Sequence, residues 1–291
     1  MRPTEIPQGT HDCPILRSAS FIALFQAAGM VLFMAMLGRR LEVSLPLMRL
    51  ITKLSAIAAA VLCVGQYALE AARMAEDMSA IADPALQMVA MHSASSVVLA
   101  LRLLGLGVII AAIDQADVGL TFSVLGATVA IGSFLLTGHT AANSLRWALA
   151  SLLIVHLTIV AFWFGALFPL YVASRRERPA IAAEVTEAFS KIAGWLVPGI
   201  FIAGIVLGLI LIHHLAEFRL SYGISILGKA AGFTVLMGLA VVNKWRLGPA
   251  IASGDPTAQR AFRRSLVIEY FFIGVVLTVT AVMTTLFSPE P

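Results

Sequence analysis

The chain has 291 residues, of which 59% are hydrophobic and only 12% are charged, whereas soluble proteins average about 45–50% apolar and about 25% charged residues. This composition excludes a disordered chain, a collagen, a coiled coil and a disulfide scaffold, and it is typical of an integral membrane protein. The 20 lysine and arginine residues give a net charge of +4 but do not form a patch on one face, so we expect basic cytoplasmic loops and no nucleic-acid partner.

Apolar runs of about 20 residues, the length that a helix needs to cross a bilayer, follow one another along the chain. They predict an all-α bundle of eight transmembrane helices that forms a single domain over residues 1–291, with the lipid bilayer as its surroundings. The runs cover about residues 16–37, 50–69, 93–113, 117–136, 145–173, 195–215, 222–242 and 265–287.

Lysine and arginine are concentrated after the first, fifth and seventh runs. Basic residues stay on the cytoplasmic side of a membrane, so we expect both chain termini outside, which is the periplasm in a Gram-negative bacterium. The sequence has no Walker loop, no nucleophile elbow and no zinc-protease motif. We therefore expect a membrane protein that is not an enzyme.

Soft metal ligands gather on the predicted outer side. Met88, Met91 and His92 fall at positions i, i+3 and i+4, which places two thioethers and one imidazole on one helical face. His139 follows a glycine in the turn between the fourth and fifth runs, at the outer mouth of the fifth. Thioether and imidazole together suit Cu(I); the alternative for the methionines is adaptable packing on an interfacial helix.

Three polar residues fall near the middle of predicted spans, where ionisable groups are costly and often functional. They are Gln26, Arg102 and His156. Arg102 needs a partner or water inside the bundle, and a neighbouring His156 would then be neutral and able to bind metal. Ordinary hydrogen bonds between helices are the alternative.

A stripe on the first run joins Gln26, Met30 and Met34 at i, i+4 and i+8. It could pass Cu(I) from sulfur to sulfur, but we favour the interpretation that these side chains face lipid. The last run carries Glu269 near its inner end, where an interfacial role is sufficient.

The fifth run places Trp163 two turns after His156, on the same face. Trp163 is either a path residue or an interfacial anchor. Gly165 allows close contact with another helix, and Pro169 is expected to interrupt this helix near the inner interface.

These residues belong to three stretches that resemble the CopD family of bacterial copper-resistance membrane proteins. Gly138-His139, His156 and Trp163-Phe-Gly165 resemble the first, and Tyr222-Gly223 with Lys229 and Asn243-Lys-Trp-Arg246-Leu247-Gly-Pro249 resemble the second. Arg263-Arg264-Ser265-Leu266 with Glu269 resembles the start of the family's final span. The sequence departs from the pattern at Leu153, where family members commonly have an acidic residue.

The resemblance implies a multi-pass protein of the bacterial cytoplasmic (inner) membrane that handles copper in copper resistance. It implies copper as the ion bound or carried, His139 at the entry and His156 near the midplane. It also implies a separate periplasmic carrier of the CopC type, since no fused copper-binding domain is found here.

Our preferred hypothesis is copper import without ATP hydrolysis, with Met88, Met91, His92 and His139 capturing the ion. The first alternative is a b-type haem electron-transfer protein, in which His156 pairs with His139 or His92 across the haem. The second is a copper sensor or assembly partner that does not transport, and the chain could also form a homo-oligomer.

Overall fold

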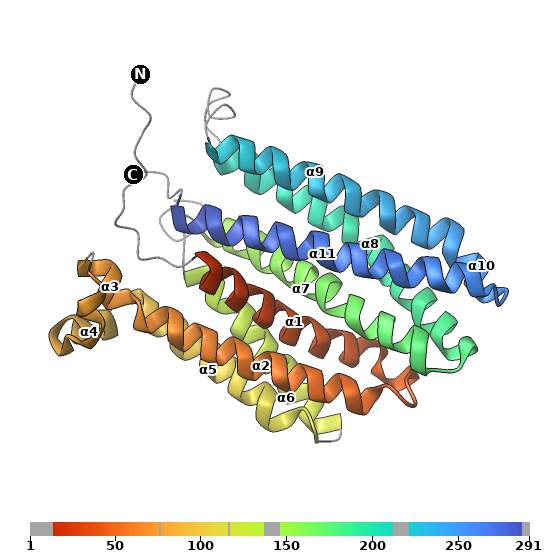
Figure 1. The fold of residues 1–291 in the computed structure, drawn as a ribbon, viewed down its shortest axis with the longest axis horizontal. Helices are drawn as coiled ribbons and strands as arrows, with labels where there is room; N and C mark the ends of the chain where they lie inside the picture. The colour runs from red at the N-terminus through yellow and green to blue at the C-terminus, as the bar shows by residue number, and fades with distance from the viewer. Residues whose placement is uncertain (1–13, 76, 116, 137–145, 212–220, 287–291) are drawn as a thin grey trace.

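The computed structural model describes residues 14–75, 77–115, 117–136, 146–211 and 221–286. Within these ranges the chain is helical, with short connections and no strand. The long helices are α1 (Pro14–Leu37), α2 (Leu45–Ala68), α5 (Ala94–Ala112), α6 (Asp117–Gly132), α7 (Arg146–Arg176), α8 (Pro179–Leu211), α9 (Ser221–Val242) and α11 (Pro256–Leu286) (Figure 1). The short ones are α3 (Glu70–Ala75), α4 (Pro84–Met91) and α10 (Gly248–Ala252).

Seven of the described helices are long and apolar enough to cross a membrane: α1, α2, α5, α6, α7, α8 and α11. The predicted all-α, multi-pass membrane class is therefore confirmed. The expected span at 222–242 corresponds to α9, which is helical throughout but is not among the seven. The predicted number of eight spans and the orientation of the termini stay predictions.

Two helices begin well before the apolar runs that predicted them. α8 begins at Pro179 instead of 195, and α11 begins at Pro256 instead of 265. The added turns of α8 carry Glu184, Glu187 and Lys191, so a hydropathy count recognises only the apolar part of the helix. The expectation that Pro169 interrupts its helix is wrong, because α7 continues through it to Arg176; neighbouring helices allow proline inside membrane helices.

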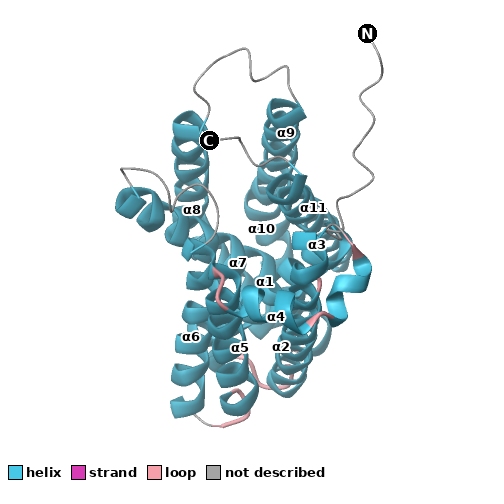
Figure 2. Ribbon diagram, turned by 90° about the vertical axis from the view of Figure 1, so that its left-hand side faces the viewer, coloured by secondary structure: helices cyan, strands magenta, loops and turns pink. Residues whose placement is uncertain are grey.

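Helix α1 lies at the centre of the bundle, between α2, α5 and α6 on one side and α8, α9 and α11 on the other (Figures 1 and 2). In its most apolar stretch 72% of the residues are buried, against 12–44% in the other six candidate spans. The stripe on α1 is part of this core, since Gln26, Met30 and Met34 are only 5%, 0% and 2% exposed. The interpretation that these residues face lipid is therefore wrong.

Helices α1 and α7 are in close backbone contact through two glycines. A Cβ atom on Gly29 would lie 1.8 Å from the carbonyl oxygen of Ala161, and one on Gly165 would lie 2.3 Å from the backbone of Gly29. The predicted close contact at Gly165 is confirmed. Because backbone meets backbone here, the position of α7 is fixed by α1.

At the end of the bundle where α1 turns into α2, the connection between α7 and α8 holds that turn in place. The carboxylate of Glu177 accepts hydrogen bonds from the backbone N–H groups of Val43 (2.9 Å) and Ser44 (2.7 Å). Burial alone would raise the pKa of Glu177, but these hydrogen bonds favour the charged form and hold the pKa below its ordinary value of 4.5. Next to it, Arg178 donates to both carboxylate oxygens of Glu42.

Candidate functional site

The face of α7 opposite α1 carries His156 and Trp163. The ring of His156 lies 3.9 Å from the place that a Cβ atom on Gly204 of α8 would take. The indole of Trp163 packs edge-on against Phe233 of α9, with ring centroids 6.3 Å apart. The two residues are seven positions apart on the continuous helix α7, about 10 Å along its axis, and helical periodicity puts them on one face.

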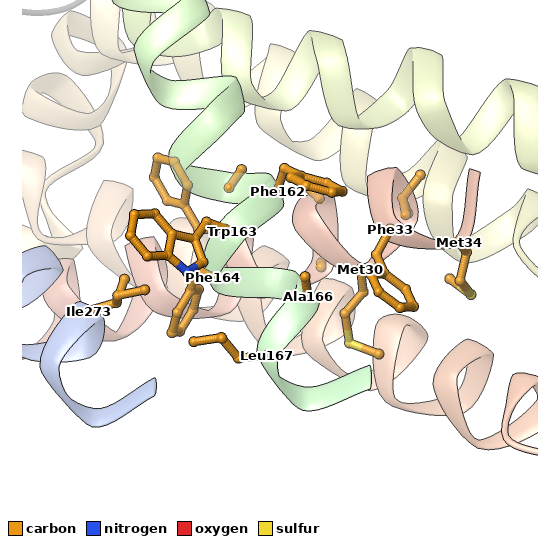
Figure 3. Close-up of a cluster of buried hydrophobic side chains, with 14 of the residues drawn as sticks. Met30, Phe33, Met34, Phe162, Trp163, Phe164, Ala166, Leu167 and Ile273 are labelled. Atoms are coloured by element: carbon orange, nitrogen blue, oxygen red, sulfur yellow. The ribbon is translucent and has the colours of Figure 1, made fainter. Parts of the chain in front are cut away.

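Figure 3 shows what lies on either side of α7 near Trp163. Trp163 lies on the side of α7 that faces Ile273 of α11, and Met30 lies on the other side. The sulfur stripe of α1 and the His156 face of α7 are therefore separated by α7 itself.

Glu269 of α11 is buried deeply beside Trp163, with 3% of its surface exposed. Three neutral groups donate hydrogen bonds to its carboxylate: the Asn243 amide, the Ser265 hydroxyl at 3.3 Å and the Trp163 indole N–H. No arginine or lysine of the described residues forms an ion pair with it. The interfacial role expected for Glu269 stays a prediction, but its carboxylate lies inside the protein.

The segment after α9 explains how Asn243 reaches Glu269. Residues Asn243–Leu247 form a π-helical turn between α9 and α10, and such turns are frequent at functional sites. Asn243 donates to α11 from this turn, while the Lys244 ammonium lies against Gly194 of α8, 2.8 Å from the place of its missing Cβ. The turn therefore supplies polar groups to two different helices.

Trp163, Asn243, Lys244 and Glu269 line one cavity of about 860 Å³ between α7, α8, α9, α10 and α11. Cavities that bind small ligands have about this size. Glu187 and Lys191 of α8 also line it and form an exposed ion pair of 2.7 Å with each other. The deepest charged group of the cavity is thus the Glu269 carboxylate.

The predicted metal ligands of α4 lie at the opposite end of the molecule from α10 (Figure 1). Met88 and Met91 are 63% and 65% exposed, and Met88 and His92 line a shallow hollow. The Nδ1 atom of His92 lies 2.8 Å from the backbone carbonyl oxygen of Met88. A neutral imidazole that donates through Nδ1 keeps the lone pair of Nε2 for a metal ion.

The interaction partners of Arg102 do not lie on the His156 face of α7. Its Nε atom donates to the Ser133 hydroxyl at 3.1 Å, and its guanidinium lies 4.6 Å from the ring centroid of Phe134. It also forms a side-chain hydrogen bond with Cys63 of α2. Arg102 thus has the partners expected inside the bundle, and they are neutral groups between α2, α5 and the turn after α6.

The predicted site residues do not meet in one place. Met88 and Met91 lie on α4 and His92 follows it directly, His156 and Trp163 lie on α7, and His139 lies outside the described residues. No group of three or more His, Cys, Asp or Glu side chains that could hold a metal ion occurs in the described part of the chain. Gln26 has both amide atoms buried, without a hydrogen-bond partner among the described residues. The contact between Asn243 and Glu269 in the cavity was not predicted, although both residues belong to the stretches that resemble the CopD family.

The comparisons with known proteins agree with the resemblance. Residues 183–283, which include most of α8 and all of α9 and α10, match the CopD family, described as copper resistance protein D. Copper resistance protein D of Pseudomonas syringae pv. tomato is 30% identical over 186 residues, which cover 59% of this chain and 59% of that protein's length. No solved structure matches. The family match and the relative together show that a large part of this chain is similar to copper resistance protein D.

Proposed function

We propose that the chain carries copper inward across the bacterial cytoplasmic membrane, as part of copper resistance or homeostasis. Its similarity to copper resistance protein D supports copper as the cargo. The observation that carries a transport role is the position of His156, which lies inside the bundle on the α7 face that continues to Trp163 and the cavity.

Capture begins on α4 in this proposal. Met88, Met91 and His92 offer soft ligands at a solvent-exposed surface, and the orientation of His92 leaves Nε2 available. With both termini outside, α4 faces the periplasm, where a carrier of the CopC type delivers copper. His139 is predicted to join this group at the entry.

Passage continues along α7. His156 offers an imidazole within the membrane, and Trp163 lies about two turns further along the same face. The cavity then opens between α7, α8 and α11 toward the α10 end, which the predicted orientation places in the cytoplasm. An ion that follows this face crosses the bundle without passing through α1.

The test is copper uptake into sealed vesicles that contain the purified protein. We expect the wild type to load the lumen with Cu(I), and His156→Ala to lower the initial rate by about tenfold, the effect of roughly 1.4 kcal/mol on a barrier. Val155→Ala is the matched control, because Val155 is exposed on the same helix. It should transport like the wild type.

The outcomes separate the competing functions. Wild-type vesicles that load no more copper than empty ones would refute transport, and bound copper without uptake would identify a sensor or assembly partner. A Soret band in the visible spectrum of the purified protein would identify the haem alternative instead.

A further inference from the structure

We propose that Glu269 gives up a proton as the copper ion reaches the cavity and takes one up again when the ion leaves. This inference rests on the proposed copper transport, and it assigns to Glu269 the compensation of the cation's charge inside the membrane. It places a titratable group beside the path, where the sequence indicated only an interfacial carboxylate.

The surroundings of Glu269 fit a group that changes its charge. A buried carboxylate without a cationic partner is costly when ionised, and its hydrogen-bond donors Asn243, Ser265 and Trp163 are all neutral. The carboxyl group can therefore be neutral while the cavity holds no cation. A monovalent cation that arrives near it supplies the missing positive charge.

The elements around Glu269 bring few other charges. Residues 18–37 of α1 and the whole of α10 contain no charged side chain. The residues of α9 that line the cavity, Met237, Ala240 and Val241, are apolar. On α11, Tyr270 stacks on Phe164 of α7, and Arg263 donates to the carbonyl oxygen of Ser174 at 3.2 Å.

The remaining charged groups lie along the cavity wall. Glu187 and Lys191 neutralise each other in their ion pair, and Lys244 lies against Gly194 of α8. Glu184 is held at the surface by Arg40, at 3.1 Å. Of the carboxylates that line the cavity, Glu269 is thus the one that is buried and has no cationic partner among the described residues.

The exchange balances charge and atoms. When Cu⁺ arrives, the O–H bond of the Glu269 carboxyl breaks, and the proton leaves to water in the cavity. The carboxylate and Cu⁺ together then carry no net charge. When Cu⁺ leaves toward the α10 end, the carboxylate takes a proton from the same water, so the cycle moves no net proton across the membrane.

The experiment counts protons released per copper ion bound. Purified full-length protein in detergent, without oxygen and in weak buffer with a pH indicator, receives Cu(I) as its acetonitrile complex. We expect the wild type to release about one proton per copper more than Glu269→Gln, because a group that ionises on metal binding releases its proton. Glu269→Gln keeps the shape and one oxygen acceptor for Asn243 and Ser265, but it cannot ionise.

Two further variants serve as controls. Glu269→Asp should release the proton as the wild type does, and so should Glu42→Gln, which removes an exposed carboxylate that does not line the cavity. In vesicles, uptake by Glu269→Gln should fall by about tenfold or more, since the cation then crosses without compensation.

The wild type provides a test that needs no variant to fold. Its extra proton release should disappear as the pH is raised, because Glu269 is then already ionised before copper arrives. Release that is equal in wild type and Glu269→Gln, or that is independent of pH, would refute the exchange while copper uptake by the wild type leaves the proposed function intact. Absence of uptake by the wild type would refute the proposed function, and this inference with it.

Discussion

The contact between α1 and α7 predicts an unusually large effect for the smallest possible substitution. In Gly29→Ala, the new methyl group would lie 1.8 Å from the carbonyl oxygen of Ala161 and 2.8 Å from the Cα atom of Gly165. To restore an ordinary contact of 3.4 Å, α7 must move away from α1 by about 1.6 Å at this point. No rotamer change relieves the clash, because both neighbours are backbone atoms.

The cost follows from the size of that movement. Overpacking a core lowers the free energy of unfolding by about 1–3 kcal/mol when side chains can adjust. The backbone at this contact cannot adjust in that way, so we expect a loss at the upper end of this range or above it. Alanine has a higher helix propensity than glycine, which stabilises the helix by up to about 1 kcal/mol. We therefore expect the free energy of unfolding to fall by about 2 kcal/mol or more. The movement also displaces Trp163 from Glu269, so copper uptake should fall together with stability.

The assay is thermal unfolding in detergent, followed by circular dichroism, for Gly29→Ala and for the matched control Gly107→Ala. A Cβ atom on Gly107 of α5 meets no atom within 4 Å, so the control should unfold at the wild-type temperature or slightly above it. Equal unfolding temperatures of the two variants would refute the close backbone packing and, with it, the argument that α1 sets the position of α7.

Two other substitutions test polar contacts away from the cavity. Arg102→Lys should destabilise the protein by about 1–3 kcal/mol in the same unfolding assay, because an ammonium cannot donate to Ser133 and lie flat on Phe134 at once; wild-type stability would show that the planar guanidinium is dispensable. Glu177→Gln should unfold at a lower temperature than the wild type at pH 7, and the difference should shrink as the pH falls below 4.5. The lowered pKa of Glu177 means that its charged form stabilises the fold above that pH and loses this effect on protonation, so a difference that does not change with pH would contradict the assignment.

Hydropathy predicted the helical bundle because a membrane helix must satisfy its backbone internally along an apolar run of defined length. It could not find the starts of α8 and α11, since the polar turns there are amphipathic. With α11 beginning at Pro256, Glu269 lies more than three turns inside the helix instead of near its first turn.

The burial of the α1 methionines within the bundle could not be predicted from the sequence either. Met30 and Met34 lie on a helix that is apolar on all sides, so periodicity does not distinguish a face toward lipid from a face toward other helices. The partners of Arg102 could not be predicted because they are a hydroxyl, a thiol and an aromatic ring, which leave no charge pattern. The shared face of His156 and Trp163 could be predicted, because helical periodicity alone determines it.

The central place of α1 has a consequence for how the protein is made. The ribosome produces α1 before α7 and α11, yet these later helices cover much of its surface. Between its own insertion and that of the later helices, α1 must therefore lie in the bilayer with Gln26 and Gly29 exposed to lipid or to other proteins. The helix that fixes the positions of its neighbours thus reaches its own final surroundings only after α11 has left the ribosome.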